Sequence, residues 1–203
     1  YQEGRKNEIV DRTSSTNIGL ALLSVISAYD LKFINIEICL ELVKNIINTV
    51  ITLPKWNGHL YNWYNIKNLT PLIPMYVSTV DSGNFVGYLY TTKNFLSNIK
   101  NEEIQKKYNV KELITKITDI IEKTDFSILY NTENGLFSIG FNIEENKLTD
   151  SYYDLLASEA RQSSLIAIAK KQVPANHWKN LGRSLTVLNG KKGLVSWSGT
   201  AFE

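Results

Sequence analysis

The sequence predicts a mainly α-helical domain that carries one small β-hairpin. Three observations indicate it. Apolar residues recur at spacings of three and four in several segments, these segments come in pairs, and one stretch alternates around an Asn-Gly pair. The chain has 203 residues, of which 43% are hydrophobic and 21% are charged, so residues 1–203 are expected to form a single globular domain.

The first pair of helices is expected between residues 18 and 50. The polar run 12–17 offers Ser and Thr side chains as caps, and an apolar stripe of helical spacing follows over 18–33. A second stripe over 36–50 ends before Pro54, because proline cannot continue a helix. Residues 55–80 break the pattern and form a long loop that is rich in aromatic residues and poor in charge, which argues against disorder.

A second pair of helices is expected after this loop. Asp81 or Ser82 caps a helix that ends at Ile99, and another helix covers 101–123. Paired helices are typical of a bundle, a solenoid or a helical toroid. The sequence shows no repeat of fixed period, which disfavours a regular solenoid.

The stretch 126–141 changes character, because its apolar residues alternate on both sides of Asn134-Gly135. This dipeptide is typical of a tight hairpin turn, so a β-hairpin is expected here. A further helix is expected over 151–171, and Pro174 opens a short one, since proline is favoured in a first helical turn.

Composition and spacing exclude several classes of partner. The formal net charge is +2 and no block of Lys or Arg stands apart, so no nucleic acid is expected to bind. The apolar runs are too short for a direct membrane segment. His59, His177 and Cys39 lack metal-ligand spacing, and there is no Gly-rich phosphate loop, so neither a metal nor a cofactor is expected.

The segment 151–161 holds the main candidate for chemistry. Ser151 and Asp154 have the spacing of a capping box. On a helix, Glu159 would lie on the side of Leu155 and face inward, with no basic residue three or four positions away. Glycosidases use a carboxyl group in such a setting to protonate the leaving glycosidic oxygen. An ordinary structural carboxylate is the alternative.

The segments 58–65 and 76–84 have a composition that suits a hydroxyl-rich ligand. They place amides, hydroxyls and one acid, Asp81, beside several Tyr and Trp rings. Sugars stack their apolar ring faces on aromatic rings while polar side chains bind the hydroxyls. The alternative is an Ω-loop whose rings pack internally and whose Asp81 merely caps a helix.

Six segments resemble, in the same order, motifs of the glucoamylase-like domain of cyclic β-1,2-glucan synthases, which is related to endo-β-1,2-glucanases. The resemblance implies a six-hairpin (α/α) toroid whose central funnel binds β-1,2-glucan. The synthases close the glucan into a ring by transfer, whereas the glucanases hydrolyse it. The matching segments are RTSSTNIGL from Arg12, GHLYNWYN from Gly58, YVSTVDSGN from Tyr76, YYDLLASEAR from Tyr152, HWKNLGR from His177 and SWSGTAFE from Ser196.

By this resemblance Glu159 is the acid/base residue of catalysis. The synthases are membrane-anchored with catalytic regions that face the cytoplasm, which implies the same location for this domain. The positions that the resemblance implies for glucan contact are Arg12, His59, Asn62, Trp63, Tyr64, Asp81, Tyr153, Asp154, Arg161 and Trp197.

Two departures from the family pattern bear on activity. Asn65 stands where the family commonly has Asp, and the family pattern continues past Glu203 to a second carboxylate. Retaining transfer needs two carboxylates across the sugar. The chain, which begins with Tyr rather than Met, is therefore expected to be an incomplete toroid, truncated at its C-terminal side. Little activity by itself, and self-association through the exposed faces, are expected.

Two alternatives to an enzyme remain at this point. A non-catalytic glucan-binding module would keep the aromatic loop and lose the role of Glu159. A helical interaction scaffold would bind no sugar, and it leaves the polar aromatic loop unexplained.

Overall fold

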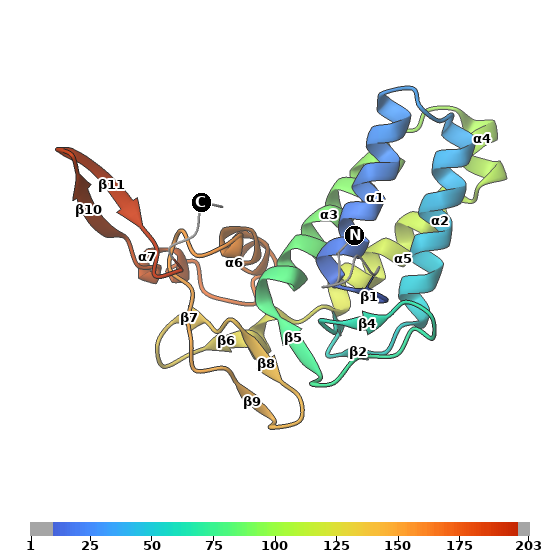
Figure 1. Cartoon of the computed structure of the whole chain (residues 1–203). Coiled ribbons are helices and arrows are strands. Elements are labelled where there is room, and N and C mark those ends of the chain that lie inside the picture. Colours follow the sequence, from blue (N-terminus) through green and yellow to red (C-terminus); the bar gives the residue numbers. More distant parts are fainter. Residues whose placement is uncertain (1–9, 199–203) are drawn as a thin grey trace.

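The computed structural model describes residues 10–198, which form a layered group of helices with small sheets at one end (Figure 1). Helix α3 lies between α1 and α6, and α2 and α5 pack on the outer side of this row. The helices are α1 (Ser15–Asp30), α2 (Ile36–Thr52), α3 (Thr79–Ser97), α4 (Glu102–Lys107), α5 (Val110–Lys123), α6 (Ala160–Ala169) and α7 (His177–Asn180), with a 3₁₀ turn, η1, at Phe126–Leu129.

Within residues 10–198, short antiparallel strands form five small sheets, four of them near the helix ends. The sheets formed by the aromatic loop, residues 55–80, and by the strands that pair with it lie where α1 and α3 begin (Figure 1). The pairs are β1 (Arg12–Thr13) with β4 (Tyr64–Asn65), β2 (Lys55–Trp56) with β3 (His59–Leu60), β5 (Tyr76–Ser78) with β8 (Gly140–Asn142), β8 with β9 (Lys147–Leu148), β6 (Tyr130–Asn131) with β7 (Leu136–Phe137), and β10 (Ser184–Leu188) with β11 (Lys191–Val195).

Helices α1 and α3 run parallel, as their contacts show. The Asn84 amide nitrogen donates to Thr16 Oγ1 over 3.3 Å, and Tyr88 lies against Gly19 further along both helices. A Cβ atom at Gly19 would lie 2.4 Å from Tyr88 Cδ2, so only glycine permits this approach. The parallel packing brings the first turns of α1 and α3 to the same end of the molecule.

Apolar stripes on α2 and α5 supply much of the core. Both helices show the spacing of three and four that the sequence predicts, and these side chains are at most 5% exposed. Their burial stabilises each helix against its neighbours at about 25 cal/mol per Å² of apolar surface removed from water. The stripes consist of Leu40, Val43, Ile47 and Val50 on α2, and of Leu113, Ile117, Ile120 and Ile121 on α5.

Several predicted helix boundaries were wrong. Helix α3 begins at Thr79 because Ser78 is its cap, with Ser78 Oγ accepting from the Asp81 amide over 3.2 Å, so neither Asp81 nor Ser82 caps it. The predicted helix over 101–123 is two helices, α4 and α5, because Asn109 adopts a left-handed conformation with φ 51°.

The largest error lies before α6. Residues 151–159 are not helical, and Ser158 has φ 50°, a conformation that a helix cannot contain. The capping box predicted for Ser151 and Asp154 is absent from this segment. Asp154 Oδ1 instead accepts from the amides of Leu156 and Ala157, which closes a turn.

The hairpin predicted over 126–141 is confirmed at its centre only, because residues 126–129 form η1 and β8 pairs with β5 instead, and another hairpin was missed. Strands β6 and β7 pair across the turn that contains Gly135, whose φ is 65°. The hairpin of β10 and β11 turns at Asn189-Gly190, the same kind of signal, and projects away from the helices (Figure 1). Among residues 10–198, no helix combines the length and the apolar character that crossing a bilayer requires.

Candidate functional site

The first turn of α3 joins the two aromatic segments that the sequence singles out. Asn62, in the loop between β3 and β4, donates from Nδ2 to Asp81 Oδ2 over 3.2 Å. Asp81 is half-buried, so its carboxylate combines one protein partner with access to solvent. These two predicted glucan contacts therefore lie side by side.

Arg12 and Trp63 form the edge of the same region. The guanidinium carbon of Arg12 lies 4.4 Å from the centre of the Trp63 ring, in a cation–π contact. Pairing of β1 with β4 sets this contact, because Arg12 stands opposite Asn65. Trp63 is half-buried and Arg12 is exposed, so both border solvent.

The charges of the two carboxylates of the predicted site, Asp81 and Glu159, both affect the pKa of two tyrosines, Tyr88 and Tyr153. Burial raises the pKa of Tyr153, and the nearby Tyr76, Asp81 and Glu159 raise it further. Burial also raises the pKa of Tyr88, with additional effects of Glu159 and Asp81. Because both carboxylates act on both phenols, Asp81, Tyr88, Tyr153 and Glu159 gather into one cluster.

Tyr88 is the member of this cluster that sequence reasoning missed. It lies seven residues after Asp81 on α3, hence on the same helix face. Because Asp81 is a predicted site residue, this spacing of seven could have indicated Tyr88 from the sequence. The half-buried Tyr88 ring lies against Gly19 of α1.

The prediction that Glu159 faces inward was wrong. Glu159 is the residue before α6, with φ −84° and ψ 23°, and its side chain is exposed. Its Oε2 accepts from the Ser158 hydroxyl over 2.6 Å. The chain turns at Ser158, whose φ of 50° is in the left-handed region. Non-glycine residues with a positive φ have a strained backbone, and such residues are enriched at functional sites.

Asp154 and Trp197 meet although they are distant in sequence. Asp154 Oδ2 accepts from the backbone amide of Trp197 over 3.0 Å. The indole Nε1 of Trp197 donates to the Tyr152 carbonyl over 3.0 Å, and the Trp197 side chain is 58% exposed. Arg161, in the first turn of α6, is also exposed.

Three of the predicted glucan contacts are buried, namely Tyr153, which is 8% exposed, and the still less exposed His59 and Tyr64. His59 is 1% exposed, and its Nδ1 and Nε2 lie 2.9 Å from Ser82 Oγ and 2.7 Å from the Asp125 carbonyl. Burial lowers the pKa of His59 to about 4. Tyr64 is fully buried, and its hydroxyl donates to the Pro54 carbonyl over 2.6 Å. Neither side chain reaches the surface; both hold the aromatic loop in place.

The two histidines belong to separate structural networks. His177 Nε2 lies 2.8 Å from Ser164 Oγ, and its Nδ1 lies 3.0 Å from the Gly135 carbonyl. Within the part of the chain that the structure describes, no group of three or more His, Cys, Asp or Glu side chains is arranged to hold a metal ion.

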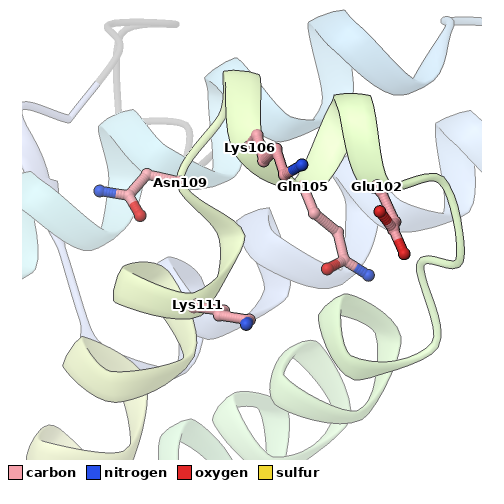
Figure 2. Close-up of a pocket in the computed structure, with 5 residues that line it drawn as sticks. All are labelled: Glu102, Gln105, Lys106, Asn109 and Lys111. Carbon is pink, nitrogen blue, oxygen red and sulfur yellow. The ribbon is translucent and has the colours of Figure 1, made fainter.

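A hollow on the outer side of the helices is unrelated to this cluster. Figure 2 shows it between α4 and the start of α5, where carboxylate, ammonium and amide groups line it. It contains none of the residues predicted for the site. Its lining residues are Glu102, Gln105, Lys106, Asn109 and Lys111.

Comparison with known proteins finds similarity of sequence and of fold to glucan-active proteins. The chain is 28% identical to cyclic beta-(1,2)-glucan synthase NdvB of Rhizobium meliloti (strain 1021) in an alignment of 321 positions that covers the whole chain. It resembles part of a cyclic β-1,2-glucan synthase. The chain spans 11% of the length of NdvB, and no protein-family model matches it.

Solved structures confirm the predicted fold class. An endo-β-1,2-glucanase from Chitinophaga pinensis superposes with a TM-score of 0.75 at 14% identity, over 97% of this chain and 47% of that one. A candidate glucoamylase from Bacteroides caccae gives a TM-score of 0.75 at 12% identity, over 94% of this chain and 47% of that one. The fold is therefore that of the glucoamylase-like helical toroids, and the chain spans about half the length of these structures.

Proposed function

We propose that this chain is part of an enzyme that acts on β-1,2-glucan. The observation that carries the proposal is the cluster of Asp81, Tyr88, Tyr153 and Glu159, which α3 and the segment before α6 supply in a fold shared with an endo-β-1,2-glucanase. The similarity to NdvB over the whole chain supports the same substrate class.

Each group of the site has a proposed role. Glu159 protonates the leaving glycosidic oxygen, while the Nδ2 group of Asn62 and the carboxylate of Asp81 bind glucan hydroxyls. Trp63 offers a ring face to a pyranose. Transfer of the glycosyl group to a hydroxyl of the same glucan closes a ring, and transfer to water is hydrolysis.

Binding is the first test. Calorimetric titration of the chain with linear β-1,2-glucan is expected to give heat of binding that a β-1,4-glucan of similar length does not give. Equal binding of both glucans would contradict the substrate class, and absence of binding would contradict the proposed site.

The second test addresses catalysis. Glu159→Gln removes the transferable proton but keeps the size and hydrogen-bonding capacity of the side chain, so glucan affinity is retained while turnover is lost. Glu144→Gln, at an exposed turn, is the matched control. Turnover is followed as release of reducing ends and as formation of cyclic products, in this chain and in any longer polypeptide that contains it.

A non-catalytic glucan-binding module is the second candidate. It is favoured by the exposure of Glu159, because an exposed carboxylate lacks the desolvation that prepares many catalytic acids. If the unmodified chain, and any longer polypeptide that contains it, binds linear β-1,2-glucan without turning it over, and Glu159→Gln leaves that affinity unchanged, this second function is the correct one.

A further inference from the structure

The carboxylate of Asp154 accepts hydrogen bonds from three backbone amides. Its Oδ1 accepts from Leu156 over 2.9 Å and from Ala157 over 2.7 Å, and its Oδ2 accepts from Trp197 over 3.0 Å. The first two bonds close the turn that leads to Glu159. The third reaches a residue 43 positions away. A carboxylate with three N–H partners organises the backbone rather than binding sugar hydroxyls.

Trp197 is held at two points, on either side of Tyr153. Its backbone amide donates to Asp154, and its indole Nε1 donates to the Tyr152 carbonyl over 3.0 Å. Tyr153 itself is 8% exposed, and the charges of Asp81 and Glu159 contribute to its raised pKa. The two bonds therefore tie Trp197 to the segment that supplies the cluster.

The indole of Trp197 is bound by its edge. The Nε1–H group is in the ring plane, so its bond to the carbonyl fixes the ring while the faces can remain open. The side chain is 58% exposed although two hydrogen bonds anchor the residue. An exposed aromatic face that is fixed in orientation loses little entropy when an apolar ligand face stacks on it.

We propose that Asp154 is a positioning residue that joins Trp197, a stacking platform for a pyranose ring of the glucan, to the turn that carries Glu159. Glucan bound on the platform is thereby held in register with the acid. This inference rests on the proposed function, and it assigns Asp154 a role different from direct glucan contact.

Asp154→Asn tests the connection selectively. An asparagine keeps Oδ1 for the two turn amides, whereas its NH₂ group cannot accept from the Trp197 amide. The asparagine side chain has a single oxygen. We expect it to face the Leu156 and Ala157 amides, where it accepts two hydrogen bonds, because facing the Trp197 amide would keep only one. Asp150→Asn, an exposed aspartate of the same segment, is the matched control.

Two readouts are measured for each variant. In Asp154→Asn, hydrogen exchange of the Trp197 amide is expected to accelerate while the Leu156 and Ala157 amides stay protected. Affinity for linear β-1,2-glucan is expected to fall about tenfold, which corresponds to loss of one charge-assisted hydrogen bond. Trp197→Ala is expected to cause a similar loss, and the double variant no further loss, because both changes remove the same platform.

The outcomes separate this inference from the proposed function. A Trp197 amide that stays protected in Asp154→Asn overturns the connection. Faster exchange with unchanged glucan affinity overturns the platform. If the unmodified chain binds no glucan, the proposed function and the platform both fail, and hydrogen exchange alone decides whether Asp154 holds Trp197 to the turn.

Discussion

Asn62 Nδ2 lies 3.2 Å from Asp81 Oδ2, a bond that fastens the aromatic loop to the first turn of α3. The amide oxygen of Asn62 is buried and has no hydrogen-bond partner among residues 10–198. Asn62 thus orients Asp81 through its Nδ2 group, while its amide oxygen lies enclosed by the protein. Both effects make the pair sensitive to substitution.

Asn62→Ala is expected to lower the free energy of unfolding by about 1–2 kcal/mol, because it leaves the half-buried Asp81 carboxylate without this donor. Urea denaturation measures the change, and calorimetry with linear β-1,2-glucan measures the accompanying loss of affinity. Asn94→Ala, at an exposed position of the same helix α3, serves as the control. Equal effects of the two substitutions would contradict the role of Asn62.

The cluster predicts a specific change in tyrosine titration. Glu159→Gln removes one of the two negative charges that act on Tyr88 and Tyr153, so the pKa of each phenol is expected to fall toward its usual value. Nuclear magnetic resonance of labelled tyrosine measures the change at Tyr88, the less buried of the two. The pKa of Tyr130 is raised by burial alone and should not move. An unchanged Tyr88 titration would place Glu159 outside the cluster.

The buried His59 predicts acid sensitivity. Its folded pKa is about 4, below the value of 6.5 that an unfolded histidine has, so the unfolded chain takes up the proton first as the pH falls. The contribution is complete above pH 6.5 and is lost between that pH and about 4. At pH 5 the loss is about 2 kcal/mol relative to pH 8.

Urea denaturation across this pH range measures the loss of stability. The resonances of the His59 ring identify its source, and a His59 that titrates near 6.5 in the folded protein would contradict the burial argument. Burial also lowers the pKa of His177, which adds to the loss with the same sign.

The close contact of α3 with α6 predicts that a side chain larger than that of glycine destabilises the protein at position 83. A Cβ atom there would lie 1.9 Å from Ser163 Oγ and 2.7 Å from Ser163 Cα, so Gly83→Ala must push the two helices apart. We expect a loss of about 1–3 kcal/mol, seen as a lower Tm. Gly193→Ala, in β11 with no atom within 4 Å of the added Cβ, should leave the Tm unchanged. A neutral Gly83→Ala would show that α6 can move away without cost.

Local sequence signals accounted for the elements whose stability is local. The apolar stripes of α2 and α5 predicted both helices, since helical periodicity is visible within a few turns, and Asn134-Gly135 predicted the hairpin of β6 and β7. The Asn189-Gly190 turn carried the same signal and could have predicted β10 and β11.

The site depended on contacts that no local pattern records. Helical propensity extended the predicted helix back through residues 151–159, but Asp154 instead bonds the turn amides and, 43 residues on, Trp197. This long-range arrangement leaves Glu159 exposed. Likewise, only the packing of α6 on α3 brings Glu159 near Tyr88, and only burial turns His59 from a predicted glucan contact into a core residue.

The sequence by itself therefore determined the helical class, the main amphipathic helices and the resemblance to glucan-active domains. The tertiary structure decided which side chains of the matching motifs face solvent and which support them from within. The physical reason is that periodicity reports burial averaged over a helix face, whereas the position of a single carboxylate or phenol depends on partners supplied by distant segments.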